Sequence, residues 1–338
     1  MRSCYNRLMN KQEKTKAHPA ERHDEPKAVR KKPGSLRGKV AVVAGATRGA
    51  GRGIARALGE LGATVYCTGR SSGKARSDMN RPETIEETAA MVTAAGGQGI
   101  ALRVDHSVRA EVDDLARTVE AQSGRIDLLV NDIWGGDDLI DWSIPFYESD
   151  VDRGLSAMHR SIDTHLITSR AFTPMMVRQG HGRIVEITDG TDYSYRGNVY
   201  YSMIKTTIIH MAFALDAALM EKGIRTLPVT PGFLRSEWML DNFGVSEANW
   251  KDGVKKEPHF IASETPLFVG RAIAALAAEP DWSPYTGRAW ASWTLSDVFD
   301  ITDADGEWPH WGRYYEKTFG KQIGVATTDG AKPPATPP

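Results

Sequence analysis

The stretch from residue 39 to residue 62, "KVAVVAGATRGAGRGIARALGELG", constrains the fold of this chain more than any other. It begins as an apolar run typical of a buried strand and ends with the apolar spacing of a helix. Between the two lie Gly45, Gly49 and Gly51. Glycines at such a turn let the backbone approach a pyrophosphate, which binds at the positive N-terminus of the helix. We therefore predict a dinucleotide site here rather than a flexible glycine-rich connector.

Short apolar runs alternate with amphipathic segments along the rest of the chain. Helical spacing covers about residues 109–123, 152–179, 198–222 and 266–278, whereas "GRIVEIT", "IRTLPV" and the edge run "GRAWAS" are typical of strands. Strands that are apolar on both faces, each followed by a helix, predict a parallel sheet covered on both sides. Right-handed crossovers between these strands give a doubly wound α/β fold in a single domain.

The two ends of the chain differ in composition from the middle. Residues 1–35 are polar, basic and poor in large apolar side chains, which predicts a disordered leader. Residues 321–338 are rich in proline at their end and predict a disordered tail without a packing role. The folded domain is therefore expected over residues 36–320.

Charge and cysteine content exclude several classes of protein. The formal net charge is -1, which argues against a general electrostatic hold on nucleic acid or membrane. No apolar run approaches the roughly 20 residues that span a bilayer, and the chain starts without an apolar signal segment. Two cysteines, Cys4 and Cys67, make no disulfide framework, and no grouping has zinc or calcium spacing. We expect a cytoplasmic protein without a metal.

The end of the second predicted strand carries information about the cofactor. An acidic residue at this place would bind the ribose 2′-hydroxyl of NAD. The sequence has Gly69 and Arg70 there, and Arg48 lies within the glycine loop. Because arginine pairs bidentately with phosphate oxygens, two arginines without a carboxylate predict the 2′-phosphate of NADP(H).

Together these motifs resemble the short-chain dehydrogenase/reductase (SDR) family, a family with the Rossmann fold, over roughly residues 36–295. "NDIWGG" matches the family's Asn-Asn-Ala-Gly motif only at Asn131, and the aromatic insertion after it resembles an extended bacterial-type branch. The resemblance implies that residues of the glycine loop, of the strand ends and of a later Pro-Gly pair bind the cofactor. These residues are Gly45, Thr47, Arg48, Gly49, Gly51, Arg70, Asp105, His106, Asn131, Tyr201, Lys205, Pro231 and Gly232.

The stretch "VYYSMIK" matches the Tyr-x-x-x-Lys motif of the family at Tyr201 and Lys205. On a helix this pair shares one face, whereas Tyr200 points elsewhere. An ammonium group beside a phenol lowers the pKa of the phenol from its ordinary value of about 10. The resemblance implies that Tyr201 gives a proton to a carbonyl oxygen while NADPH delivers hydride, or accepts an alcohol proton in the opposite direction. Lys205 is expected to bind the nicotinamide ribose.

Two other positions of the family's catalytic set differ in this chain. Where a serine is expected, counting back from Tyr201 gives Thr188, and counting forward from the strand gives Asp189. A threonine hydroxyl donates a hydrogen bond, whereas an ionised carboxylate only accepts one and repels a developing alkoxide. Thr188 is therefore the predicted donor, unless Asp189 is held protonated or faces a substrate hydroxyl or amine. The family's helix asparagine corresponds to Ser161.

Aromatic residues follow Gly232, where the family has a mobile lid, here expected over about residues 233–265. With Trp134 and Trp142 expected near the pocket mouth, they predict an apolar or ring-bearing carbonyl or alcohol substrate. Packing of the lid on the core or on a neighbouring subunit remains the alternative. A cluster of Trp308, Trp311, Tyr314 and Tyr315 is expected to dock the carboxyl segment on the body or on another subunit.

Two functions remain open from the sequence. The first is an NADP(H)-dependent SDR oxidoreductase that interconverts a carbonyl and an alcohol. The alternative, suggested by Ser161 and by Thr188 with Asp189, is a catalytically impaired NADP(H)-binding relative that acts as a sensor or scaffold. The resemblance also implies a homo-oligomer, a dimer or tetramer, that associates through the helices at 152–179 and 198–222.

Overall fold

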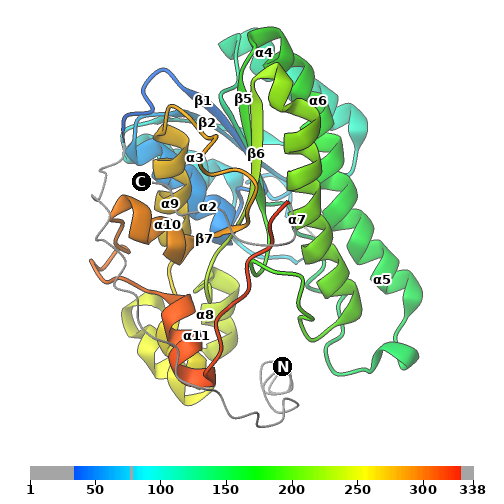
Figure 1. Cartoon of the computed structure of the whole chain (residues 1–338). Helices are drawn as coiled ribbons and strands as arrows, with labels where there is room; N and C mark the ends of the chain where they lie inside the picture. The colour runs from blue at the N-terminus through cyan, green and yellow to red at the C-terminus, as the bar shows by residue number, and fades with distance from the viewer. Residues whose placement is uncertain (1–33, 77–78, 329–338) are drawn as a thin grey trace.

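The computed structural model describes residues 34–76 and 79–328, which form one α/β domain around a parallel sheet (Figure 1). Within these residues the sheet has seven strands in the order β3-β2-β1-β4-β5-β6-β7, and all neighbours are parallel. The strands are β1 (Val40–Ala44), β2 (Thr64–Gly69), β3 (Gln98–Arg103), β4 (Leu128–Asn131), β5 (Gly182–Ile187), β6 (Ile224–Thr230) and β7 (Trp290–Ala291). The predicted doubly wound sheet is confirmed, and "GRAWAS" supplies its short edge strand.

The first strand shows why these runs are apolar throughout. Successive side chains of a strand point to opposite faces of the sheet. Val40 and Val42 belong to one buried cluster, and Ala41 and Val43 belong to another on the opposite face. Because both faces of the sheet are covered, every residue of β1 is buried and none is polar.

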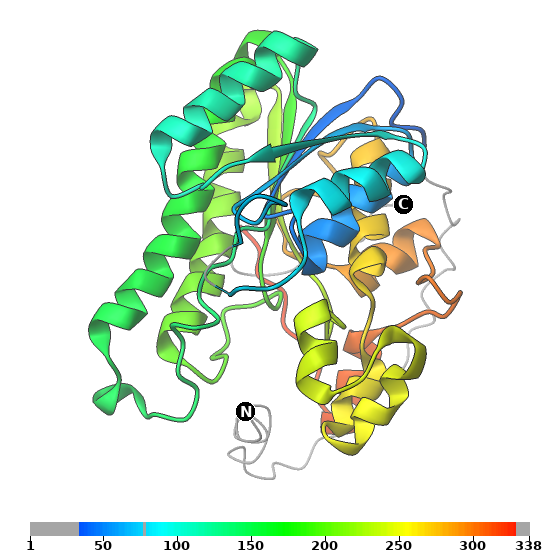
Figure 2. The same cartoon turned by 180° about the vertical axis from the view of Figure 1, so that it is seen from behind.

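Helices cover the two faces of the sheet in separate layers. They are α2 (Gly49–Glu60), α3 (Ile85–Ala94), α4 (Arg109–Ser123), α5 (Val151–Met158), α6 (Thr164–Gln179), α7 (Val199–Leu219), α9 (Pro266–Ala278) and α10 (Ser292–Phe299). The helices α2, α3, α9 and α10 pack together on one face, and α4, α6 and α7 lie on the other (Figures 1 and 2). Neighbouring strands β1 and β4 mark the point where the strand order reverses, which is where such folds bind ligands.

The long helix predicted over residues 152–179 forms with one irregular turn. α5 continues through a π-helical turn, η2 (His159–Asp163), into α6. The next long helix, Val199–Lys222, is long and apolar enough to cross a membrane by length and composition. It packs on β5 and β6 in one of the two helix layers that cover the sheet, and this position accounts for its length and apolar composition.

A second group of short helices lies below the carboxyl ends of the strands (Figure 1). It contains α8 (Glu237–Phe243), η4 (Glu247–Lys255), η5 (Pro258–Ala262) and α11 (Trp311–Phe319). The first three make up the predicted lid segment. α11 joins them from a distant part of the sequence through Trp311, whose ring contacts Phe233 with centroids 5.9 Å apart.

The prediction that the tail has no packing role is wrong for residues 324–328. Ala326 is buried, its N–H donates to the Thr191 carbonyl, and its own carbonyl accepts from the Ala289 N–H. Small residues let this segment lie against the body, whereas the proline-rich composition describes only the residues that follow. The predicted leader and the rest of the tail fall within residues 1–33 and 329–338, outside the described residues.

Candidate active site

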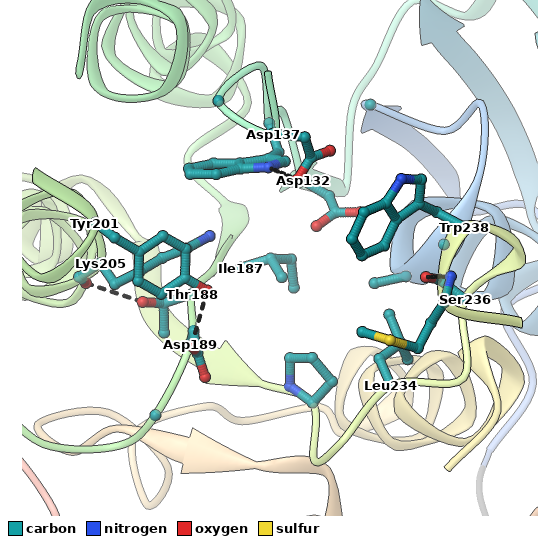
Figure 3. Close-up of a pocket in the computed structure, with 18 of the residues that line it drawn as sticks. Asp132, Asp137, Ile187, Thr188, Asp189, Tyr201, Lys205, Leu234, Ser236 and Trp238 are labelled. Atoms are coloured by element: carbon teal, nitrogen blue, oxygen red, sulfur yellow. Dashed lines mark hydrogen bonds between the residues drawn. The ribbon is translucent and has the colours of Figure 1, made fainter. Parts of the chain in front are cut away.

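A cavity of about 1200 Å³ lies at the carboxyl ends of the strands. We call one wall the glycine-loop side and the opposite wall the aromatic side. The glycine-loop side consists of residues 45–50, 69–71 and 104–107, and the aromatic side of residues 134–142, 231–243 and 311–323. The predicted catalytic residues Thr188, Asp189, Tyr201 and Lys205 lie between the two sides (Figure 3).

Close backbone packing shapes the glycine loop. Gly45 has a φ of +91°, and a Cβ at this position would overlap the backbone oxygen of Asp132. A Cβ on Gly51 would in turn overlap the backbone oxygen of Gly45. Only glycine permits this approach, which packs the loop tightly against the end of β4 and places the first turn of α2 at the cavity. The loop therefore has the cradle that a dinucleotide pyrophosphate needs.

A carboxylate from the aromatic side occupies the N-terminus of α2. The Gly49 N–H donates to Glu237 Oε2 at 2.8 Å, and Glu237 Oε1 lies 3.7 Å from Arg52 Nε. Glu237 belongs to α8, so this bond joins the two sides of the cavity. The first turn of a helix binds anions because its N–H groups lack partners within the helix. Glu237 thus occupies an anion position of the glycine loop.

Both predicted arginines line the cavity near the end of β2. Arg48 Nη2 donates to Ser71 Oγ at 3.4 Å, and Arg48 Nε lies 3.5 Å from Glu83 Oε2. Burial lowers the pKa of Arg48, opposed chiefly by the Glu83 carboxylate. Arg70 follows Gly69 on the same wall. Both arginines therefore lie where the sequence placed them, but the Glu83 carboxylate pairs with Arg48, so the expectation that no carboxylate accompanies them is wrong.

Asp105 and His106 both lie at the end of the third strand, but they have different surroundings. Burial alone would raise the pKa of Asp105, yet hydrogen bonds from Ser107 outweigh it and hold this pKa below its ordinary value. His106 is bonded through both ring nitrogens, to Thr68 at 2.8 Å and to Thr168 at 2.9 Å. Burial lowers the pKa of His106 to about 3, so this ring is a neutral link between β2 and α6.

Tyr201 and Lys205 lie on the cavity face of α7, as their spacing predicts (Figure 3). Tyr201 Oη donates to Asp189 Oδ2 at 2.8 Å. The Lys205 ammonium lies 4.3 Å from the centroid of the Trp134 ring and 5.4 Å from that of Tyr201. Tyr200 instead packs into a separate buried cluster. The structure therefore assigns the cavity position to Tyr201.

The expected lowering of the Tyr201 pKa is not found. Burial and the Asp189 carboxylate raise the pKa of Tyr201 well above its ordinary value of 10. Burial also lowers the pKa of Lys205, although neighbouring carboxylates act in the opposite direction. Asp132 joins this group, since burial raises its pKa to about 7 against the opposing effect of Lys205. In this arrangement the phenol keeps its proton.

The prediction that Thr188 faces Tyr201 is wrong, because Asp189 takes that place. Thr188 continues the pairing of β5, with its N–H donating to the Val229 carbonyl. Its hydroxyl donates to the Lys205 backbone oxygen at 2.9 Å (Figure 3). The pleat then directs the next side chain, Asp189, toward Tyr201 and the cavity.

Two other predicted residues do not reach the cavity wall. Asn131 is fully buried and donates to Ser169 and to Glu186, each at 2.9 Å. Ser161 is fully buried in η2, and its hydroxyl has no hydrogen-bond partner among the described residues. Thr47, Pro231 and Gly232 do line the cavity.

The arrangement of three features next to the site was not predicted. His165 and Glu186 form a buried pair, with Nδ1 and Oε2 2.5 Å apart, and His165 Nε2 also bonds to the Ile133 carbonyl. Trp134 lines the cavity and contacts Tyr201, with ring centroids 5.5 Å apart. Residues 311–323 close the far wall. A buried charge in strand β5 was the one available signal, since "GRIVEIT" carries Glu186 among apolar neighbours.

Comparison with known proteins gives a consistent result. The family model described as short chain dehydrogenase matches residues 39–243. The mouse protein "Dehydrogenase/reductase SDR family member 1" is 30% identical over 276 residues, which cover 80% of this chain and 85% of the mouse protein.

Two solved structures show the same fold. A short chain dehydrogenase of Mycobacterium thermoresistibile superposes with a TM-score of 0.66 at 22% identity, covering 90% of this chain and 100% of that one. A metagenomic short-chain oxidoreductase in complex with NADP has a TM-score of 0.55 at 24% identity, covering 73% of this chain and 94% of that one.

Proposed function

This chain belongs to the short-chain dehydrogenase/reductase family, and from that premise we propose that it uses NADP(H) to interconvert a carbonyl and an alcohol. One observation carries the proposal. Tyr201 and Lys205 face the same cavity as a glycine loop at the N-terminus of a helix. A proton donor and a dinucleotide cradle that share a cavity are what hydride transfer to a carbonyl requires.

The glycine-loop side supports NADP(H) in particular. Gly45 and Gly51 let the loop take the tight conformation that brings the first turn of α2 to the cavity, where a pyrophosphate would replace the Glu237 carboxylate at the Gly49 N–H. Arg48 and Arg70 would bind the 2′-phosphate, and β2 ends in Gly69 where an NAD site carries an acidic residue. The NADP complex of the metagenomic relative agrees with this choice.

On the aromatic side we propose an apolar or ring-bearing substrate. Trp134, Trp142, Phe233 and Trp238 line this part of the cavity, and aromatic walls bind apolar rings. The nicotinamide of NADPH, when bound, supplies the hydride. Tyr201 would donate the proton to the carbonyl oxygen, and Lys205 would orient the cofactor ribose and stabilise the phenolate that remains.

Tyr201→Phe tests this function directly. With aldehydes, ketones and quinones as substrates, the change should lower kcat by about 10²–10⁴-fold, because the proton donor is lost. NADPH binding, followed by fluorescence titration, should stay unchanged. Tyr200→Phe is the matched control, since that side chain packs away from the cavity. Full activity of Tyr201→Phe would refute the assignment.

A second candidate function is a catalytically impaired NADP(H)-binding sensor. It is favoured by the hydrogen bond from Tyr201 to Asp189, which holds the proton that a reductase must donate. This candidate predicts saturable NADPH binding without turnover of any substrate in the panel. Turnover that depends on Tyr201 would exclude it.

We also propose that the protein is a homo-oligomer that associates through α5, α6 and α7. Several apolar side chains on these helices or directly at their ends are exposed. An exposed apolar surface of this kind favours a partner. They are Val151, Leu155, Leu166, Val177, Met203 and Met220. Light scattering should give the mass of a dimer or tetramer, and Leu155→Glu with Leu166→Glu should reduce it.

A further inference from the structure

Asp189 accepts a hydrogen bond from Tyr201, the residue proposed to protonate the substrate. Tyr201 Oη donates to Asp189 Oδ2 at 2.8 Å, and Asp189 is exposed on the cavity wall. A neutral phenol has a single proton to donate, so Tyr201 must leave Asp189 before it can donate to a substrate. Asp189 then faces the cavity without that hydrogen bond. A carboxylate that loses its donor in a site closed by substrate needs a replacement.

The polar groups beside Asp189 already have other partners. The Thr188 hydroxyl donates to the Lys205 carbonyl. The Arg196 guanidinium, which is nearly buried, donates to three backbone carbonyls, those of Asp189, Asp192 and Ser194. Neither group is directed at the Asp189 carboxylate. A substrate group that donates hydrogen bonds would therefore meet no competing donor from Thr188 or Arg196 at the Asp189 carboxylate.

Lys205 does not balance the charge of this part of the cavity. Burial lowers the pKa of Lys205, and three carboxyl groups around it raise this pKa, those of Asp189, Asp132 and Asp137. All three aspartates line the cavity. The Arg196 guanidinium also acts on Lys205, so two cations lie among these three carboxyl groups.

Aromatic rings surround the same spot. The Trp134 and Trp142 rings lie with their centroids 5.5 and 5.0 Å from that of Tyr201. Trp134 already receives one cation on its face, the Lys205 ammonium. A carboxylate next to aromatic rings is the arrangement that binds organic ammonium groups in proteins.

We propose that the substrate carries a protonated amine close to its reacting carbon and that this amine donates to Asp189. The inference rests on the proposed function and names the substrate class of the same site, an amino ketone and the corresponding amino alcohol. The ammonium group takes the place of the Tyr201 hydroxyl at Asp189. Tyr201 is then free to turn to the carbonyl oxygen.

The reaction balances with the proposed cofactor. In reduction, the hydride of NADPH forms a C–H bond as the C=O π bond breaks, and the Tyr201 proton forms the O–H bond. Solvent returns one proton to Tyr201, and NADP⁺ is released. The amine stays protonated at Asp189 and takes no part in the bond changes. Asp189 is therefore a specificity residue that also controls when Tyr201 is available.

Binding of a matched pair of alcohols tests the proposal. The pair is obtained by reducing α-(dimethylamino)acetophenone and isovalerophenone, which differ in having an ammonium nitrogen or a CH group at one position. Calorimetry in the presence of NADPH avoids turnover, because NADPH cannot oxidise an alcohol. The native enzyme should bind the amino alcohol at least about tenfold more tightly, as expected for one charge-assisted hydrogen bond.

Asp189→Asn should remove this preference, because the amide carries no charge. Asp192→Asn should keep it, since Asp192 also lines the cavity but pairs with Arg196 at 3.6 Å. Equal binding of the two alcohols to the native enzyme would overturn the proposal, and so would a preference that survives in Asp189→Asn.

The two parent ketones separate this proposal from the proposed function. Turnover of the amino ketone with a higher kcat/KM than isovalerophenone, lost in Asp189→Asn, is the result expected if both are correct. A binding preference without turnover of any carbonyl would leave the charge selectivity standing and refute the oxidoreductase function. Turnover of both ketones at equal kcat/KM would support the function and overturn the amine.

Discussion

The two sides of the cavity are built in different ways. On the glycine-loop side, the turn at residues 45–51 is shaped by backbone, because Gly45 and Gly51 approach the backbone of Asp132 and of Gly45 so closely that a Cβ would overlap it. The aromatic side is made by side chains from three segments that lie far apart in the sequence. Tyr201 and Lys205 lie between them. Binding of the cofactor therefore depends on local geometry, whereas choice of substrate depends on how distant segments meet.

Gly45→Ala should break the glycine-loop side with the largest effect. A methyl group would overlap the Asp132 backbone, and the positive φ adds strain. Overpacking and strain together correspond to about 100-fold weaker NADPH binding. Fluorescence titration measures this loss. Gly73→Ala is the control, because a Cβ there has no neighbour within 4 Å; equal NADPH affinity of the two variants would contradict the proposed cradle.

Glu237→Gln should weaken the hydrogen bond that joins the glycine-loop side to the aromatic side. Its carboxylate accepts from the Gly49 N–H, at the place proposed for the pyrophosphate. Removing this negative charge should tighten NADPH binding by about tenfold, since the cofactor then displaces a weaker, neutral hydrogen bond. Asp241→Asn removes the same charge elsewhere on α8, from a residue paired with Arg81, and should leave the affinity nearly unchanged. Weaker binding to Glu237→Gln would show that the carboxylate supports the loop instead.

Thr188→Ala should lower kcat less than the loss of a hydrogen-bond donor to the substrate carbonyl would lower it. Loss of such a donor lowers kcat by about 10²-fold or more. The Thr188 hydroxyl bonds instead to the Lys205 carbonyl, so we expect a loss below about tenfold, as for one neutral hydrogen bond. Steady-state kinetics of Thr188→Ala, with Thr188→Ser as the control, decides between these two roles of the Thr188 hydroxyl. A 100-fold loss in Thr188→Ala with full activity in Thr188→Ser would restore Thr188 as the donor.

Glu264 should affect neither side of the cavity directly but should give a pH-dependent change in stability. It is buried behind Gly232 and accepts from Ser292 at 2.6 Å, and burial raises its pKa from 4.5 to about 8. Between these two pH values the folded chain holds a proton that the unfolded chain releases. The contribution of Glu264 to the free energy of unfolding therefore decreases as pH rises from 4.5 to 8.

Urea unfolding at pH 5, 7 and 9 measures this decrease. The difference between the native chain and Glu264→Gln should grow in favour of the variant as pH rises. A difference that stays constant with pH would contradict the raised pKa.

Patterns that are local in the sequence predicted the fold and the glycine-loop side. Apolar runs gave the parallel sheet because its strands are buried on both faces, and α9 has the predicted bounds, Pro266–Ala278. Helical spacing also separated Tyr201 from Tyr200, because only Tyr201 shares a helix face with Lys205. Each of these patterns can be recognised within a single strand, turn or helix.

Features that depend on distant contacts could not be predicted in this way. The choice between Thr188 and Asp189 depends on how far β5 continues its pairing with β6 before the chain turns, a one-residue difference that reverses both side chains. Trp134 reaches Tyr201 because of the packing of its loop on α7. Ser161 is turned inward by a π-helical turn that the apolar spacing of the helix does not reveal.

The carboxyl-terminal segment has a consequence for how relatives of this chain diverge. Residues 324–328 bond to Thr191 in the loop that follows Asp189, and residues 311–323 line the aromatic side. This wall lies outside the sheet and its crossovers, so insertions and deletions there leave the Rossmann core intact. Changes in residues 311–328 can therefore reshape the aromatic side of the cavity while Tyr201, Lys205 and the glycine loop stay in place.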